Sequence, residues 1–161
     1  MTTSAGLLLY RVRDGALEVL LGHMGGPFWA RRDAGAWSIP KGELADGEEA
    51  LAGAHREFAE ELGHPAPDGE AVPLGEVRQR GGKRVVAFAL EGDFDPAALD
   101  PGTFEMEWPP RSGRRQRFPE IDRVAWLGLE DARRLVVRAQ AELIDRLAGA
   151  DRGVADEEGW L

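Results

Sequence analysis

Residues 42–63 read GELADGEEALAGAHREFAEELG, and this stretch decides which fold the chain is expected to adopt. Glu57, Glu60 and Glu61 are three and four residues apart, so a helix places their carboxylates on one side. Like charges at this spacing repel, and a helix gains no stability by gathering them. A bound divalent cation supplies a reason, because hard ions such as magnesium take carboxylate oxygens. The stretch therefore predicts a metal site that performs chemistry on phosphates.

The helix that carries these acids has recognisable ends. We expect it to begin between residues 47 and 51, where Asp46 and Glu49 could form a capping box. It should end near residue 62, because Gly63 suits the left-handed position that follows a helix. Its apolar stripe consists of Leu51, Ala54, Phe58 and Leu62. The acids lie about a quarter turn from that stripe, so the helix can pack on a sheet and still present them to a cleft.

The segments around this helix read mostly as strands. Residues 4–13 and 17–24 are expected to form a hairpin around Asp14-Gly15, a favoured turn pair. A glycine-rich loop follows at 25–36, and Trp37 to Pro40 should be extended because Pro40 disfavours helix before it. Further strands are predicted at 72–79, 84–90, 103–108 and 122–127, with a second helix at 129–147.

The central stretch resembles the signature box of the Nudix hydrolases. Gly42, five residues, Glu48, seven residues, and then the run from Arg56 to Gly63 match its fixed positions, including all four glutamates. The last position of the box, which is usually aliphatic, is His64 here, beyond the helix end and away from the acids. Residues 37–43, WSIPKGE, also resemble the lead-in that is usual in the family.

The resemblance implies a fold and a domain organisation. It implies an α/β (α+β) protein with a mixed β-sheet between helices, a sandwich in which the box forms a loop–helix–loop. Residues 1–148 would be a single Nudix domain. Residues 149–161 are acidic and read as a flexible C-terminal tail.

The resemblance also implies magnesium or manganese as the cofactor and gives roles to the residues of the box. Glu57, Glu60 and Glu61 would bind the metal, and the Gly42 carbonyl would add an oxygen. Arg56 would orient Glu57. Glu48 would in turn hold Arg56 by an ion pair, so that these two residues support the metal ligands without taking part in catalysis.

A general base must take a proton from the attacking water. Glu60 and Glu61 are both candidates, and the sequence does not choose between them. In some relatives the base lies on a loop outside the box, and Glu120 occupies a position that resembles such a loop acid. The alternative for Glu120 is a surface residue at a turn. Glu105 and Glu107 are weaker candidates for the base.

Basic and aromatic residues outside the box are candidates for substrate binding. Lys41 lies beside the box, and Trp29, in the loop with Phe28, could stack on a base, whereas Trp37 fits core packing better. One basic cluster consists of Arg78, Arg80, Lys83 and Arg84, and a second contains Arg111, Arg114, Arg115 and Arg117. Either cluster could attract phosphates or could simply be a solvated hairpin or loop.

Composition and charge limit the partners and the cellular compartment to be expected for this chain. The chain has 161 residues and a formal net charge of −9, which argues against general nucleic-acid binding. It lacks cysteine, which fits a reducing cytoplasm. No apolar run reaches the length of a membrane span, and the N-terminus MTTSAG does not read as a signal peptide. We expect a cytoplasmic protein that binds a small-molecule nucleotide. Oligomerisation has no support in the sequence.

The leading hypothesis is a metal-dependent pyrophosphohydrolase. A nucleoside triphosphate or a dinucleoside polyphosphate is favoured as substrate, because two basic clusters suit a long phosphate chain. Nucleotide sugars, coenzyme A derivatives and capped RNA stay open. A non-catalytic nucleotide sensor on the same fold is the alternative of another class, and it fits less well because every acid of the box is kept. An isomerase on this fold would want a cysteine, which the chain lacks.

Overall fold

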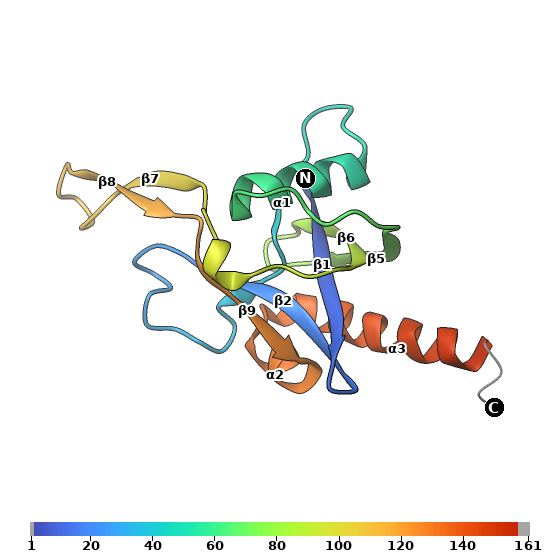
Figure 1. Ribbon diagram of the computed structural model, residues 1–161. Helices are drawn as coiled ribbons and strands as arrows, with labels where there is room; N and C mark the ends of the chain where they lie inside the picture. The colour runs from blue at the N-terminus through green and yellow to red at the C-terminus, as the bar shows by residue number, and fades with distance from the viewer. Residues whose placement is uncertain (1, 158–161) are drawn as a thin grey trace.

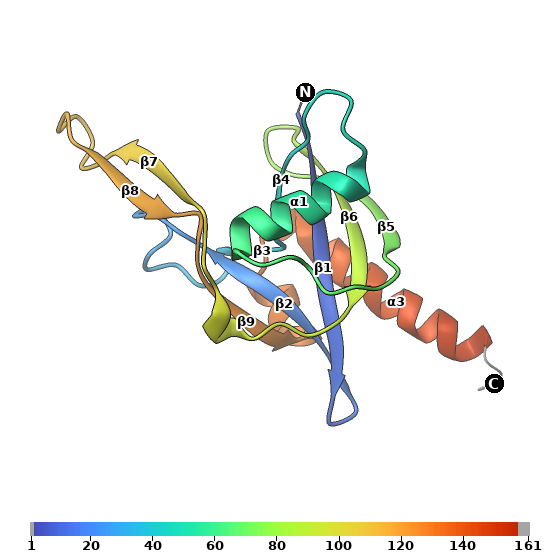
Figure 2. The same cartoon turned by 45° about the horizontal axis from the view of Figure 1, so that its top comes forward.

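A computed structural model describes residues 2–157. Within this range a seven-stranded mixed sheet is covered by α1 (Ala50–Leu62) on one face and by α2 (Leu129–Leu135) and α3 (Ala141–Glu157) on the other (Figures 1 and 2). The order β3-β2-β1-β6-β5 forms the main path; β4 pairs with β1, and β9 pairs with β2. The mixed sheet between helices confirms the predicted fold class.

Strand β1 (Thr3–Arg13) is the centre of the sheet and buries both of its faces. Ala5, Leu7 and Leu9 face the core under α1, whereas Leu8 faces the core under α2 and α3. Strand β1 runs antiparallel to β2 (Ala16–Met24) through the predicted Asp14-Gly15 turn and parallel to β6 (Arg84–Glu91). Both turn residues have positive φ, 54° and 77°, as a tight two-residue hairpin requires. The predicted hairpin is therefore confirmed.

Helix α1 ends as predicted but begins differently. Gly63 has a φ of 80°, and its N–H donates to the Ala59 carbonyl at 2.8 Å, which closes the last turn. Ala54, Phe58 and Leu62 are buried against the sheet. The capping box is wrong, because the N-cap is Glu49 and no side chain caps the helix.

The predicted second helix is interrupted. α2 ends at Leu135, and Val136 is extended, with φ −70° and ψ 154°. Val136 forms a bridge with Trp37, and the Val137 N–H donates to the Trp37 carbonyl at 2.8 Å. A short 3₁₀ turn, η2 (Arg138–Gln140), then leads into α3. Pairing with Trp37 therefore overrides the helical periodicity that predicted one continuous helix.

Helix α3 continues past residue 148, where the sequence suggested that the domain ends and a flexible tail begins. Residues 158–161 lie outside the described residues. The domain boundary therefore stays a prediction.

The remaining elements place the cleft. The short strands β3 (Trp37–Ser38) and β4 (Lys41–Glu43) carry the lead-in to the box. Strand β5 (Val72–Arg78) pairs with β6, and the short helix η1 (Pro96–Ala98) and strand β9 (Ile121–Gly128) lie further along the chain. Strands β7 (Thr103–Glu107) and β8 (Arg115–Pro119) form a separate hairpin that projects from the body of the protein (Figure 2). Strand β8 was not predicted. No described helix meets the length and apolarity needed to cross a membrane.

Candidate active site

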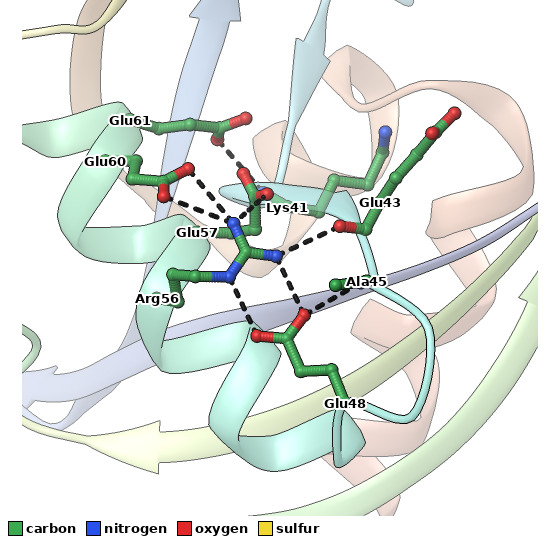
Figure 3. Close-up of polar contacts among 8 residues, drawn as sticks. All are labelled: Lys41, Glu43, Ala45, Glu48, Arg56, Glu57, Glu60 and Glu61. Atoms are coloured by element: carbon green, nitrogen blue, oxygen red, sulfur yellow. Dashed lines mark hydrogen bonds and ion pairs between the residues drawn. The ribbon is translucent and has the colours of Figure 1, made fainter.

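A cleft of about 430 Å³ opens at one end of the sheet, beside α1. It is lined by α1, by strands β2, β3 and β4, and by the segments at the base of the β7–β8 hairpin. Its charged lining comprises Lys41, Glu43, Glu57, Glu60, Glu61 and Glu120. Four of the six acids that the sequence proposed as metal ligands or bases, Glu57, Glu60, Glu61 and Glu120, therefore line one cavity. Figure 3 shows the part of this site around α1 and β4.

The close approach of β4 to α1 depends on a glycine. Gly42 pairs with Ala5 of β1, which fixes β4 beside the helix. A Cβ atom at Gly42 would collide with the Glu57 carboxylate, so only glycine leaves room for that side chain. One residue earlier, the Lys41 N–H donates to Glu61 Oε2 at 3.0 Å. The backbone of β4 thus contacts two of the three helix acids.

Arg56 links the acids to the loop that precedes the helix. Its Nε and Nη2 donate to Glu48 at 2.8 and 2.9 Å, and its Nη1 donates to Glu57 Oε1 at 2.8 Å and to Glu60 at 3.1–3.2 Å. Nη2 also donates to the Glu43 carbonyl at 3.0 Å. Figure 3 shows the guanidinium between Glu48 on one side and Glu57 and Glu60 on the other. These are the contacts that the resemblance implied for Arg56 and Glu48.

The donor set suits a hard divalent cation. Glu57, Glu60 and Glu61 offer carboxylate oxygens, and the space that the missing Cβ of Gly42 leaves is filled by the Glu57 carboxylate. Among the described residues, no three acidic or histidine side chains already converge on one point. Glu57 and Glu60 instead contact Arg56, so binding a cation requires their carboxylates to turn toward Glu61. The Glu57 side chain is 14% exposed and the Glu60 side chain is 58% exposed, so Glu60 is free to turn.

Burial and crowding perturb the charges in the cleft. Burial raises the pKa of Glu61 to about 8, although the Lys41 N–H lowers it, and the neighbouring charges of Glu57 and Glu120 raise it further. Burial also lowers the pKa of the Lys41 amine, against the attraction of Glu61. The Glu120 pKa is raised, first by burial and then by Glu57. Burial and neighbouring carboxylates therefore disfavour the ionised forms of Glu61 and Glu120 in this cleft.

Glu120 faces the helix acids from the opposite wall. It precedes β9, and its backbone is held on both sides: its N–H donates to the Gly102 carbonyl at 2.8 Å, and its carbonyl accepts from Gly25 at 3.0 Å. Glu105 and Glu107 lie on the projecting hairpin and do not line the cleft. Glu105 faces Arg115 and Arg117, at 3.8 and 3.5 Å. Of the acids proposed outside the box, only Glu120 shares the cavity with α1.

The proposed substrate-binding residues are spread more widely. Lys41 lines the cleft, and the charge of Lys83 acts on it, which shows that the β5–β6 turn lies close by. Arg78 and Arg80 are exposed and do not line the cleft, whereas Arg84 binds Glu76 with both Nε and Nη2, at 2.7 and 2.8 Å. Arg84 is thus engaged by a partner on the sheet.

The proposed aromatic residues and the second basic cluster also lie in different environments. Trp37 is buried and donates through Nε1 to Asp33, which confirms the core interpretation. Trp29 is partly buried against the core under α2 and α3, whereas Phe28 is exposed. Arg114 is exposed on the projecting hairpin, outside the cleft.

Two buried polar residues that the sequence did not single out support the site. Gln140 is fully buried: its Oε1 accepts from the Ile39 N–H at 3.0 Å, and its Nε2 donates to Ser38 and Gln79. His23 is also fully buried and contacts Asp122 and the Arg32 carbonyl. Gln140 has no local sequence signal, because its partners are about 60 to 100 residues away.

The comparisons with known proteins agree with this geometry. Residues 2–147 match the NUDIX domain family. A C. elegans Ap4A hydrolase in a binary complex is 22% identical, with a TM-score of 0.62, over 95% of this chain and 99% of that one. The NUDIX domain of Shewanella oneidensis NrtR, complexed with ADP ribose, is 17% identical, with a TM-score of 0.60, over 92% and 86%. The M. smegmatis Nudix hydrolase RenU is 22% identical, with a TM-score of 0.60, over 94% and 86%.

At these identities the solved structures show the fold alone. No curated protein matches the chain. The family match, in contrast, extends over almost all of the described residues and includes the box that lines the cleft. The chain therefore belongs to the Nudix family, whose pyrophosphohydrolases act on nucleoside diphosphate-linked compounds.

Proposed function

We propose that this protein hydrolyses a pyrophosphate bond of a nucleoside triphosphate or a dinucleoside polyphosphate, with magnesium or manganese bound by the acids of α1. The observation that carries the proposal is the single cleft in which Glu57, Glu60 and Glu61 of the helix face Glu120 and Lys41. Carboxylates so crowded need a cation, and a polyphosphate needs both cations and a positively charged side chain.

Each residue has a part in this proposal. Glu57, Glu60 and Glu61, with the Gly42 carbonyl, hold the cation, which would neutralise phosphate oxygens and activate water. Lys41 binds a phosphate oxygen of the substrate. Arg56 and Glu48 keep the helix acids oriented through the hydrogen bonds described above.

An acid that lines the cleft takes a proton from the attacking water. The oxygen of water forms a bond to phosphorus, the bridging phosphorus–oxygen bond breaks, and the departing phosphate carries away the bonding electrons. One proton of the water passes to a carboxylate. We favour Glu120, since it lines the same cleft as the helix acids, and burial raises the pKa of its carboxyl, which makes its carboxylate a stronger base than a solvent-exposed one. Glu60 and Glu61 are the alternatives.

The substrate class rests on the surroundings of the cleft. Lys83 lies near Lys41, and Arg78 and Arg80 continue the positive charge along the β5–β6 turn. A phosphate chain that extends beyond the metal would meet these groups, whereas a short diphosphate would not. The solved Ap4A hydrolase of the same fold is consistent with this class.

A substrate panel tests the proposal. The protein is incubated with magnesium and, separately, manganese, together with nucleoside triphosphates, dinucleoside polyphosphates, nucleotide sugars and coenzyme A derivatives. Products are separated by ion-exchange chromatography. We expect a nucleoside triphosphate to give nucleoside monophosphate and pyrophosphate, and a dinucleoside polyphosphate to give two nucleotides. Turnover should fall by several orders of magnitude for Glu60→Gln and Glu61→Gln. Near-normal turnover in both variants would remove the proposed metal roles. Binding without turnover across the panel would instead identify a nucleotide sensor.

A further inference from the structure

Two segments begin at the mouth of the cleft and extend away from it. The first is the loop at 25–36, which starts just after Met24 of the cleft wall. The second is the β7–β8 hairpin, whose base residues Gly102, Thr103 and Glu120 line the cleft. In Figures 1 and 2 both segments lie on the same side of the sheet, away from α3. We call the hairpin, residues 103–119, the arm.

The arm rests on the loop through aromatic contacts. An isolated two-stranded hairpin is marginally stable in water, so the arm needs a partner. A Cβ atom on Gly26 would lie 3.0 Å from the Phe104 ring, which places the loop backbone directly against the arm. Further out, the rings of Phe28 and Trp108 meet edge to face, with centroids 5.6 Å apart and an interplanar angle of 75°. The two segments therefore form one platform that continues from the cleft.

This platform exposes an aromatic surface. Phe28 is 60% exposed, although its ring is large and apolar, and Trp108 and Met106 beside it are only partly buried. A single exposed apolar side chain is ordinary, but an exposed ring that packs on a second, partly buried ring near a cleft indicates a binding surface. Val12 and Val72, the other exposed large apolar residues among those described, lie on strands far along the chain from this platform.

The platform is also locally basic, in a protein whose net charge is −9. Within the described part of the chain, Arg31, Arg111 and Arg114 have no acid within ion-pair distance. Arg115 and Arg117 of the arm do have one, Glu105. Arginines left without acidic partners next to exposed rings suit a ligand that presents both a flat π-face and negative charge.

We propose that the platform is the nucleobase subsite of the enzyme, in which the base of the substrate stacks on the Phe28–Trp108 pair while Arg111 and Arg114 donate hydrogen bonds to acceptor atoms on the edge of the base. The proposal rests on the proposed function and adds the location of the base. Thr103 lines the cleft and Trp108 is five residues further along the arm, a span of roughly 16 Å at about 3.3 Å per residue. A phosphate chain held at the helix acids therefore leads the base outward to the rings.

Binding of two matched ligands tests the subsite. The first ligand is the bis-methylene analogue of ATP, which has no phosphorus–oxygen–phosphorus bond to hydrolyse. The second is its base-free counterpart, in which the same bis-methylene chain is attached to ribose without a base. Both are titrated into the protein with excess magnesium and followed by calorimetry. Because the two ligands share the same charge-bearing chain, the difference between their affinities isolates the base.

The expected changes in affinity separate the contribution of the base from that of the phosphate chain. Phe28→Ala and Trp108→Ala should each weaken the ATP analogue about tenfold and leave the base-free ligand within about twofold, since stacking on one ring contributes roughly that factor. The double variant Arg111→Gln with Arg114→Gln should weaken the ATP analogue and leave the base-free ligand within about twofold, because both arginines follow Trp108 on the arm and contact the base. Val12→Ala and Arg134→Gln, an exposed apolar and an exposed basic residue elsewhere, are matched controls that should change neither affinity.

Other outcomes overturn the proposal or separate it from the proposed hydrolysis. Equal weakening of both ligands by Phe28→Ala and Trp108→Ala, or no weakening of either, rules out a base-stacking role. Trp108→Phe keeps a ring, so it should retain most of the base-dependent affinity; loss equal to that of Trp108→Ala would indicate damage to the arm instead of lost stacking and would count against the subsite. If no substrate is hydrolysed but the base-dependent loss persists, the proposed function fails and the subsite stands. If a substrate is hydrolysed but the base contributes nothing to affinity, the subsite fails and the proposed function stands.

Discussion

The His23 Nδ1 atom lies 2.9 Å from Asp122 Oδ1, while the other ring nitrogen lies 2.7 Å from the Arg32 carbonyl oxygen. His23 is fully buried, and its two ring nitrogens therefore join β2, β9 and the loop at 25–36.

The His23→Asn variant should destabilise the protein and free this loop. Loss of two buried hydrogen bonds is expected to lower the free energy of unfolding by about 2 kcal/mol. Urea denaturation measures the loss, and amide hydrogen exchange should accelerate in residues 25–36. His55→Asn, on the half-buried surface of α1, is the control and should change stability far less. Equal stability of the two variants would contradict the bridging role.

Glu48 should make stability depend on acid pH. The hydrogen bonds from Arg56, and then the Ala45 N–H, lower the pKa of Glu48 to about 2 from an ordinary value near 4.5. The folded state therefore prefers the ionised carboxylate, and its contribution is complete above about pH 4.5 and lost as the pH falls through 2. The difference in melting temperature between wild type and Glu48→Gln should be largest at pH 7 and shrink over that range. Glu49→Gln, at an N-cap that makes no side-chain bond, should show no such difference.

The sequence predicted what depends on nearby residues. The Asp14-Gly15 turn, the end of α1 at Gly63 and the acid face of that helix are local patterns, and the structure contains all three. The predicted capping box does not form, because a neighbouring acid competes with it. Glu48, one residue earlier than the expected Glu49, accepts from Ala45 and is held by Arg56, so the chain enters the helix without a capping side chain.

What the sequence could not predict depends on residues far apart. The break at Val136 arises because that residue pairs with Trp37, about a hundred positions earlier, and helical periodicity contains no sign of it. Strand β8 is rich in arginine and mostly exposed, so it lacks the alternation that marks a strand. It forms by pairing with β7. The place of Phe28 against Trp108 likewise follows from how the loop and the arm meet.

Gln140 provides a test of such a distant contact. Gln140→Leu would leave the Ile39 N–H without its acceptor and remove the donor to Ser38 and Gln79 in a buried environment. We expect a loss of about 3 kcal/mol in the free energy of unfolding, measured by urea denaturation. Turnover should also fall, because Ile39 lies two residues before Lys41. Gln116→Leu, which loses one exposed hydrogen bond, is the control, and a Gln140 variant as stable as it would contradict the role.

Metal binding should be coupled to proton release at Glu61. Burial raises the pKa of this carboxyl to about 8 in the metal-free protein, and a carboxylate must be deprotonated to bind a cation. Affinity for Mn²⁺ should therefore fall about tenfold for each pH unit below 8, with about one proton released on binding. Calorimetry in buffers of different ionisation enthalpy measures both quantities. Glu61→Gln should bind more weakly and with no such dependence; a pH-independent wild type would exclude Glu61 as a ligand.

The same shift sets the stability of the metal-free protein. The folded state binds a proton at Glu61 that the unfolded chain releases above its ordinary pKa near 4.5, so stability should fall as the pH rises from about 4.5 to 8. Saturating Mn²⁺ should remove this trend, because the ion replaces the proton and neither state then binds one at Glu61 in this range. Thermal melts across this range, with and without the ion, measure both effects, and a metal-free melting temperature that rises toward pH 8 would contradict the buried carboxyl.

Gly42→Ala tests whether the close approach of β4 to α1 is needed for activity. The added Cβ would occupy the position of the Glu57 carboxylate, so that side chain must move by about 1 Å or more. Such a displacement of a metal ligand is expected to lower kcat about a hundredfold. Gly128→Ala is the matched control, because a Cβ there meets no atom and its φ of −63° suits alanine. If both variants hydrolyse the substrate at the wild-type rate, the position of Glu57 beside β4 has no part in the reaction.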